Sequence, residues 1–529
     1  MQRRGFLAGS SAVSALGVSR GVAAQRPDAR VLRFVPQSDL TVLDPHWTTA
    51  YVTRNHALAV FDTLFGSDGS GRATPQMLAG YAVGDDGRQW TLTLRDGLRF
   101  HDGEPVRARD CVASIRRWGA RDAYGQALLA ATDELSAADD RTVTFRLRRP
   151  FVRLPDALGK VASYLPAIMP ERLANTDPFK QVTEMVGSGP FRFLAGERVP
   201  GARVVYQRFD GYVPREGSVP DMTAGPKVAT VERVEWLAIP DAATAAAALQ
   251  SGEVDWWESP AADLLPLLGQ DRNVRLDVID PTGAMPMMRM NHLTPPFNNP
   301  AVRRAVLMAT NQAEYMQAYV GTDDRLWRAG VGVFPPGTEL ASDAGMEALA
   351  HPDAGKAKAA LRAAGYGGEK VVLMAATDLG NSRALADVGA DLLRRLGMDV
   401  DYQLMDWGTL NQRRVKKEPA AQGGWSVFYT QWAGLDLLNP AGNLALRGNG
   451  ADAWLGWPTS PRLEALRDAW LQTADPAAGK AIAADIQEQA FVDVPFIPLG
   501  QMVLPTAYRT TLSGVPRGAP VFWNLRKTA

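Results

Sequence analysis

The chain has 529 residues, of which 46% are hydrophobic and 22% are charged, with 57 basic residues balancing 57 acidic ones. This length corresponds to about three to four domains, or to two large ones, with deep hydrophobic cores. The balanced charge excludes a polybasic nucleic-acid-binding protein and an acidic disordered tail. The composition therefore indicates a globular protein that binds no nucleic acid.

The sequence offers few ligands for a metal. Cys111 is the only cysteine, so neither an internal disulfide nor a cysteine-ligated zinc or iron–sulfur site is expected. The five histidines are scattered, and no H-E-x-x-H motif occurs. We therefore expect no metal and no cofactor.

The first residues have the pattern of an export signal. Arg3-Arg4-Gly5-Phe6-Leu7 matches the twin-arginine motif R-R-x-F-L, and a mildly apolar stretch over 8–18 follows it. Small residues at 22–24 suit cleavage after Ala24, and no cysteine follows that could carry a lipid. We expect export by the twin-arginine route, with an ordinary Sec signal as the alternative. No later stretch has 18 uninterrupted apolar residues, so the mature chain is expected to be free in the periplasm.

From Val31 onward, short strands and helices alternate, which is typical of an α/β protein. Asp110 is expected to cap a helix that starts at Cys111, and Gly252 to end a helix over 242–250. Strands are also expected at 31–35, 90–94, 231–236, 254–257, 371–375, 398–404 and 496–499. Further helices are expected at 56–65, 301–309, 354–364, 384–396, 463–471 and 478–491. Residues 371–404 therefore form a predicted β-α-β unit.

Enzyme motifs are absent from the predicted mature chain. The one G-x-S-x-G match spans 17–21, inside the predicted signal, and no glycine-rich nucleotide-binding loop occurs. We therefore expect no enzyme activity. A carboxylate dyad built from distant residues stays open as an alternative, which would make the protein a periplasmic hydrolase of a peptide or glycan.

Several segments follow one another as they do in one known family. The longest is Asp85 to Val106, which reads DDGRQWTLTLRDGLRFHDGEPV, and 186–191 reads VGSGPF. Further matching segments are 61–64, 74–79, 239–241, 248–255, 290–305, 357–366 and 493–499. Together they resemble the family 5 extracellular solute-binding proteins, which are periplasmic receptors of peptide- and nickel-type ABC importers.

The resemblance implies a two-lobed periplasmic binding protein fold, class II-like, with the ligand cleft between the lobes. Lobe I is expected to comprise 25–285 and 501–529, with an extra subdomain at about 50–190, and lobe II to comprise 286–500. Two crossing strands near 281–286 and 501–505 would join the lobes. Closure would then be stabilised only when a ligand touches both lobes.

The resemblance also points to one strand end in lobe II as part of the binding site. Peptide receptors of the family have W-x-x-D there, and the acid pairs with the ammonium group of the peptide. Trp432 matches, but Leu435 occupies the acidic position and Asp436 follows one residue later. A one-residue shift in a strand turns a side chain to the opposite face, unless a bulge intervenes. Trp425 and Tyr429 are further candidates, with burial in the core as the alternative.

Lobe I is expected to contribute the loop after its first strand, with His46, Trp47 and Tyr51 as ligand contacts. Arg289 is a candidate contact for an anionic ligand, with a surface salt bridge as the alternative. The expected function is capture of a peptide-like or other small polar solute and its delivery to an ABC permease in the inner membrane. The receptor is expected to be monomeric, and a peptide-holding chaperone is a further alternative.

Overall fold

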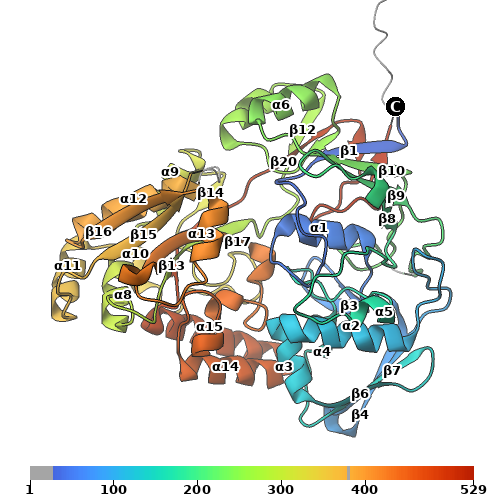
Figure 1. The fold of residues 1–529 in the computed structure, drawn as a ribbon, viewed down its shortest axis with the longest axis horizontal. Coiled ribbons are helices and arrows are strands. Elements are labelled where there is room, and N and C mark those ends of the chain that lie inside the picture. Colours follow the sequence, from blue (N-terminus) through green and yellow to red (C-terminus); the bar gives the residue numbers. More distant parts are fainter. Residues whose placement is uncertain (1–27, 218, 378–381, 529) are drawn as a thin grey trace, which may run out of the picture.

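The computed structural model describes residues 28–217, 219–377 and 382–528, and the predicted signal lies outside them. Two seven-stranded sheets organise this part of the chain, one in each of two lobes (Figure 1). The first sheet has the order β12 (Val274–Asp277), β20 (Thr506–Arg509), β11 (Trp256–Trp257), β1 (Val31–Val35), β10 (Arg233–Leu237), β9 (Arg203–Arg208) and β8 (Phe191–Phe193). Strand β1 is parallel to both of its neighbours, and the other pairs are antiparallel.

The second sheet is built from strands that all lie between residues 284 and 502. Its order is β14 (Trp327–Arg328), β19 (Gln501–Met502), β13 (Ala284–Met290), β17 (Val427–Ala433), β15 (Val371–Ala376) and β16 (Val400–Met405), while β18 (Ile497–Pro498) pairs with β13. The chain passes from the first sheet to the second over 278–283 and returns over 503–505. Sheet membership therefore divides the fold at two crossings.

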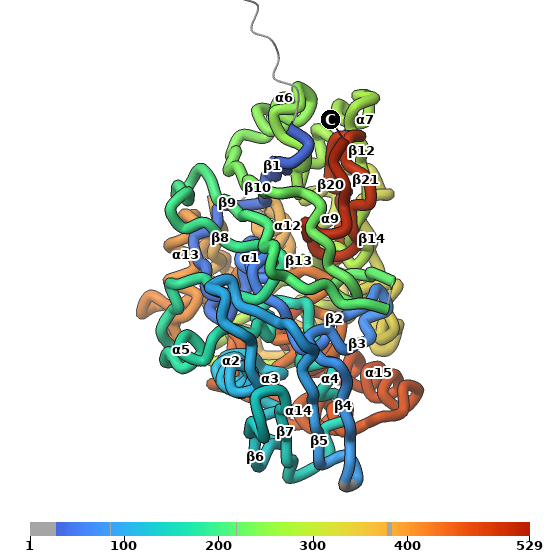
Figure 2. Tube along the Cα trace, turned by 90° about the vertical axis from the view of Figure 1, so that its right-hand side faces the viewer, coloured from blue at the N-terminus to red at the C-terminus, as the bar shows by residue number. Residues whose placement is uncertain are grey.

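A four-stranded antiparallel sheet forms the far end of the first lobe, opposite the seven-stranded sheet (Figure 2). Its order is β4 (Leu78–Gly84), β5 (Gln89–Leu94), β7 (Thr142–Leu147) and β6 (Thr132–Ala137). Helices α2 (Ala108–Arg121) and α3 (Ala123–Ala131) pack against it. Two small pairs complete the strands, β2 (Phe65–Ser67) with β3 (Ala73–Pro75), and β21 (Leu512–Ser513) with β22 (Arg526–Lys527).

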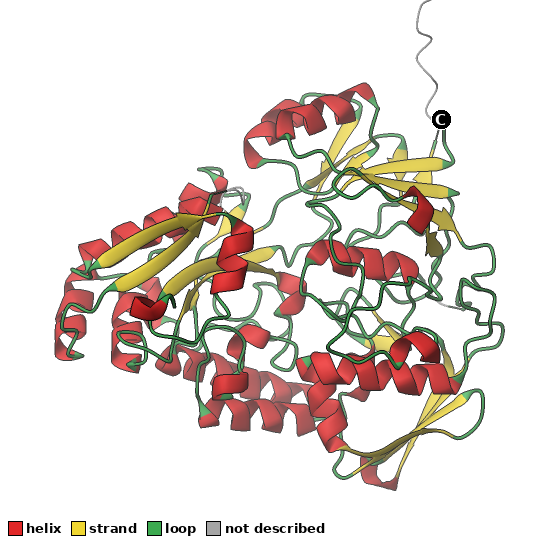
Figure 3. Cartoon of the chain, in the orientation of Figure 1, coloured by secondary structure: helices red, strands yellow, loops and turns green. Residues whose placement is uncertain are grey.

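The remaining helices surround the sheets (Figure 3). Those of the first lobe are α1 (Tyr51–Val60), α4 (Leu154–Leu158), α5 (Glu171–Ala174), α6 (Ala242–Ser251) and α7 (Leu265–Gly269). Those around the second sheet are α8 (Pro300–Met308), α9 (Gln312–Val320), α10 (Glu347–Ala350), α11 (Ala354–Ala363), α12 (Ser382–Arg395), α13 (Trp407–Arg413), α14 (Pro461–Gln472) and α15 (Pro476–Asp493).

Local signals placed several elements correctly. Strand β1 has the predicted bounds, and α6 ends at Gly252, which adopts the left-handed conformation with φ of 82°. Strands β15 and β16 pair in parallel, which confirms the predicted β-α-β unit. These elements depend on short-range patterns of capping and apolar spacing, which the sequence carries directly.

Two helix starts were predicted wrongly. Helix α1 covers 51–60 rather than 56–65, and every residue from 52 to 60 is buried, Arg54 and His56 included. A helix buried on all sides has no polar face, so periodicity does not locate its ends. Helix α2 begins at Ala108, and Asp110 is its third residue, where the carboxylate accepts the Arg107 backbone N–H at 2.8 Å.

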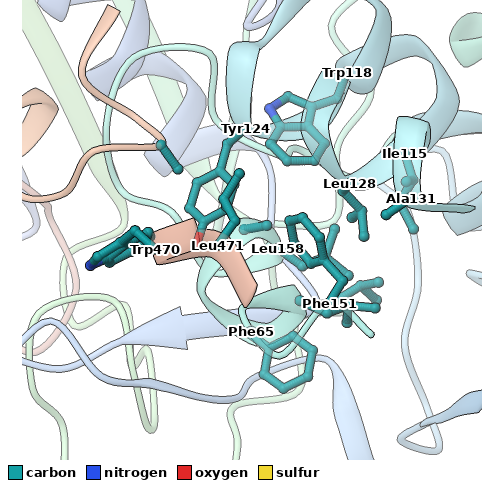
Figure 4. Close-up of a cluster of buried hydrophobic side chains, with 14 of the residues drawn as sticks. Phe65, Ile115, Trp118, Tyr124, Leu128, Ala131, Phe151, Leu158, Trp470 and Leu471 are labelled. Atoms are coloured by element: carbon teal, nitrogen blue, oxygen red, sulfur yellow. The ribbon is translucent and has the colours of Figure 1, made fainter. Parts of the chain in front are cut away.

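One hydrophobic core connects the two lobes. Trp470 and Leu471 of α14 lie beside Tyr124 of α3 and Leu158 of α4, and Phe151 lies close by (Figure 4). All of these side chains are buried. The lobes therefore meet through an apolar contact between helices, which we call the helical seam.

Candidate functional site

A cavity of about 600 Å³ lies between the lobes. Its first-lobe wall comes from the β2–β3 turn and from α4 with the loop that follows it. The second-lobe wall comes from the turn after β17 and from the junction of α14 and α15. The lining is Ser67, Gly69, Ser70, Gly71, Ala73, Arg153, Asp156, 159–162, Asp221, Met222, 280–282, 337–340, Leu435, Asp436, Leu438, Asn439, Gly442, Trp470, Pro476, Gly479, Arg517 and Gly518.

Acidic side chains outnumber basic ones in the cavity wall. The lining contains five carboxylates, Asp156, Asp221, Asp280, Glu339 and Asp436, but only three cations, Arg153, Lys160 and Arg517. Two of the cations already have acidic partners, since Arg153 contacts Asp156 at 3.4 Å and Lys160 contacts Asp122 outside the lining. Among the described residues, no other wall carboxylate has an ion-pair partner. The wall therefore suits a ligand with a cationic group.

Burial raises the pKa of Asp156, despite its contact with Arg153, and makes two further acids of the wall costly to ionise. It raises the pKa of Asp436, which is 3% exposed, and that of Asp280 in the first crossing segment. The positive charge of Arg54 partly offsets this effect at both acids. The Arg54 guanidinium lies over the Tyr51 ring, with its carbon 5.2 Å from the ring centroid. A cationic ligand group would favour the ionised form of both acids further.

Hydrogen bonds cross between the lobes at the end of β17. The Tyr51 hydroxyl accepts the backbone N–H of Ala433, and the backbone N–H of Ser163 donates to Asp436 Oδ1 at 2.7 Å. The chain after Ala433 turns through a short 3-10 segment, Gly434–Asp436, which carries both Leu435 and Asp436 to the cavity wall. We call these two bonds the polar seam.

Comparison with known proteins agrees with this architecture. The profile of the bacterial extracellular solute-binding proteins, family 5, matches residues 72–451. The chain belongs to this family.

The chain is 38% identical, over 99% of its length and 98% of the relative, to a protein of Sinorhizobium fredii named "probable peptide ABC transporter periplasmic-binding protein y4tO". It is 26% identical to the glutathione-binding protein GsiB of Salmonella typhimurium, over 95% of each chain. Two solved structures share the fold. AgaA of A. tumefaciens in complex with agropinic acid gives a TM-score of 0.78 at 22% identity, covering 94% of this chain and 99% of AgaA. DppA of Helicobacter pylori in complex with the peptide STSA gives a TM-score of 0.77 at 21% identity, covering 94% of this chain and 98% of DppA.

Among the second-lobe residues predicted to bind ligand, Asp436 lines the cavity, but Trp432, Trp425 and Tyr429 do not. Trp425 is fully buried, and its indole N–H donates to the Arg414 carbonyl at 3.0 Å. The Tyr429 and Trp432 side chains are also buried, the first beside Tyr315 and the second in the core that joins the lobes. For these three rings, the alternative of core burial describes the structure.

The first-lobe candidates are not among the residues that line the cavity. His46 is buried, and burial lowers its pKa to about 4, so the ring is neutral at pH 7. Trp47 packs under the Arg121 guanidinium, whose carbon is 4.9 Å from the ring centroid. Tyr51 differs from the other two candidates because its hydroxyl connects the lobes, as one bond of the polar seam.

The position of Arg289 differs from both interpretations of the sequence, which were a contact to an anionic ligand and a surface salt bridge. The side chain is fully buried, and its guanidinium donates to the carbonyls of Leu455, Ala445, Pro495 and Trp454. It is not part of the cavity lining, and among the described residues it has no ion-pair partner. Arg289 therefore ties loops of the second lobe together.

Sequence reasoning missed Arg153, Asp280, Trp470 and Gly479, which all line the cavity. Arg153 precedes a short helix, and Trp470 lies within a helix whose apolar residues indicate a core. No local pattern connects residues so far apart. The contact of α14 with the first lobe places Trp470 against Arg153. Among the described residues, no group of three His, Cys, Asp or Glu side chains could hold a metal ion.

Proposed function

We propose that the protein is the substrate-binding receptor of an ABC importer, which captures a peptide-like or other small polar solute and delivers it to an inner-membrane permease. The observation that carries the proposal is the cavity of about 600 Å³ lined by both lobes. Its volume suits a small organic ligand. The names of the relatives support the transporter role, since y4tO is named for a peptide ABC transporter. GsiB, AgaA and DppA bind three different solutes, so the family likeness leaves the ligand open.

We place lobe I at 25–285 and 501–529, with an extra subdomain at about 50–190, and lobe II at 286–500. Sheet membership supports this division and suggests a small refinement. Strand β13 begins at 284 and β19 ends at 502, and both belong to the second sheet. The crossings then fall at 278–283 and 503–505, where the backbone would bend as the lobes open.

The proposed location is the periplasm, reached through the twin-arginine signal in residues 1–24. The names of the relatives support this location. Within the described residues, no helix combines the length and hydrophobicity needed to span a bilayer. Changing Arg3-Arg4 to Lys-Lys should abolish periplasmic accumulation. Export of the altered chain at the wild-type level would instead assign the signal to the Sec route.

Receptor action requires a ligand that favours the closed form by touching both lobes. We propose that the protein does this as a monomer and without chemistry on the ligand. Mass spectrometry of compounds that co-purify with the natively exported protein identifies the ligand. Small-angle scattering should then show a smaller radius of gyration when that compound is added back. Turnover of the compound would favour the hydrolase alternative, and broad affinity for unfolded chains would favour a chaperone.

A further inference from the structure

Two hydrogen-bond donors in the cavity wall have no acceptor among the described residues. They are the indole Nε1–H of Trp470, whose side chain is 4% exposed, and the Nε–H of Arg153. Figure 4 shows the indole nitrogen at the edge of the ring that faces away from Tyr124 and Leu158. A buried donor without an acceptor is costly and calls for an explanation.

The two side chains converge on one small space. The Arg153 guanidinium lies over the Trp470 ring, with its carbon 4.4 Å from the ring centroid. A Cβ atom added to Gly479 would stand 3.2 Å from Arg153 Nη2 and 3.7 Å from Trp470 Nε1. Gly479 lies in the first turn of α15, where a residue with a side chain would extend toward both donors. Its missing side chain keeps open the space that both donors border.

The start of α15 adds a third favourable element. This helix has 18 residues and begins at Pro476, and both Pro476 and Gly479 line the cavity. The amino-terminal end of a helix carries partial positive charge and attracts anions. Nearby acids use only some of the donors, since Asp475 accepts the Ala478 N–H and Asp156 contacts Arg153 Nη1. The Arg153 Nε–H and the indole N–H stay available.

We infer that Arg153, Trp470 and the start of α15 form a subsite for a carboxylate group of the ligand. The guanidinium supplies charge, the indole N–H supplies a directed hydrogen bond, and Gly479 supplies room for the oxygen atoms. The inference rests on the proposed receptor function and narrows its substrate class to acidic or zwitterionic solutes. The unpaired carboxylates elsewhere in the wall would then meet a cationic group of the same molecule.

Sodium acetate is a suitable probe, because it presents a carboxylate and little else. The ¹⁵N-labelled indole resonances of the full mature chain are recorded, and the Trp470 signal is assigned by its loss in Trp470→Phe. We expect this signal to shift saturably with acetate, and to stay in place with acetamide or sodium chloride at equal concentration. An unmoved signal, or an equal shift with chloride, would overturn the subsite.

Two variants test the same residues. Arg153→Met removes the charge and Gly479→Ala fills the space, and each should weaken acetate binding about tenfold or more. The thermal stability of Gly479→Ala is measured alongside, and an unchanged melting temperature separates blocked binding from misfolding. Arg526→Met is the matched control, because Arg526 is an exposed cation of β22 outside the cavity lining, and it should leave acetate binding unchanged. Wild-type acetate binding in both test variants would refute the inference.

The experiments distinguish failure of the carboxylate subsite from failure of the proposed receptor function. A chain that retains a neutral solute, closes on it and ignores acetate would keep the receptor function and lose the carboxylate subsite. A chain that binds acetate at Trp470 but retains no solute and does not close would keep the subsite and lose the receptor function.

Discussion

The two seams between the lobes are held by different interactions, apolar burial in one and hydrogen bonds in the other. The helical seam buries Trp470 and Leu471 against Tyr124 and Leu158, whereas the polar seam consists of hydrogen bonds at Ala433 and Asp436. Apolar burial is non-directional and scales with area, while a hydrogen bond has a small net free energy but a narrow geometry. We therefore expect the helical seam to contribute more than the polar seam to the free energy that holds the two lobes together. The polar seam fixes how the end of β17 meets the first lobe.

The largest effect is expected from breaking the helical seam. Leu471→Ala removes a buried side chain and leaves a void, which should lower the free energy of unfolding by about 2–5 kcal/mol. Denaturant unfolding measures the loss, and small-angle scattering should show a larger radius of gyration. Leu267→Ala is the control, because Leu267 is 47% exposed and its loss should change stability by less than about 0.5 kcal/mol. If the Leu471→Ala variant is as compact and as stable as the wild type, the polar seam rather than the helical seam holds the lobes together.

A ligand experiment tests the acid that belongs to the polar seam. Leu435 offers no counter-charge, and Asp436 already accepts a hydrogen bond from Ser163. Di- and tripeptides that place their α-ammonium at the Leu435 position should therefore bind weakly or not at all, because an ammonium buried there without a full partner costs about 3 kcal/mol, or about a hundredfold in Kd. The preferred ligand lacks that ammonium or places its cation on Asp436. Calorimetry of a di- and tripeptide mixture against wild type, then of the best ligand against Asp436→Asn, measures both. Micromolar peptide binding that survives Asp436→Asn would contradict this prediction.

Removing the other bond of the polar seam should have a smaller effect. Tyr51→Phe keeps the ring beneath Arg54 but leaves the buried Ala433 N–H without an acceptor, at a cost of about 1–3 kcal/mol. Denaturant unfolding of the variant and the wild type gives the difference. Tyr81→Phe on the exposed strand β4 is a matched control and should be neutral. If the two variants behave alike, the Tyr51 hydroxyl contributes nothing to closure.

The smallest effect concerns charge in the polar seam. Burial raises the pKa of Asp436, so its ionised form destabilises the ligand-free fold at pH 7. Asp436→Asn should therefore raise the free energy of unfolding by about 1 kcal/mol at pH 7. The gain should shrink as pH falls through the raised pKa toward 4, because the wild-type acid then becomes neutral as well. Unfolding measured at pH 7 and pH 4 checks the sign. A gain that grows on acidification would show that the carboxylate is stabilised by its surroundings.

The sequence predicted what depends on neighbours along the chain and missed what depends on neighbours in space. Helix α6 and its glycine stop follow from local propensity and capping, and so does the β-α-β unit. The cavity, in contrast, draws on Arg153, Asp436 and Trp470, which are brought together by folding alone. The sequence does not show whether the aromatic residues of β17 lie in the core or contact a ligand, because the same residue types serve both roles. Asp436 was accessible to reasoning only through the W-x-x-D resemblance, and the 3-10 turn after β17 explains how it reaches the wall.

The placement of β20 has a consequence for the order of biosynthesis. This strand comes from 506–509 near the carboxyl terminus, yet it lies between β11 and β12 in the first sheet. The second sheet is built from one continuous stretch, 284–502, whereas the first sheet also needs the segment that follows this stretch. The first sheet, whose earliest strand is β1, stays split until the ribosome has released almost the entire chain. The lobe that is begun first is therefore the lobe that is finished last.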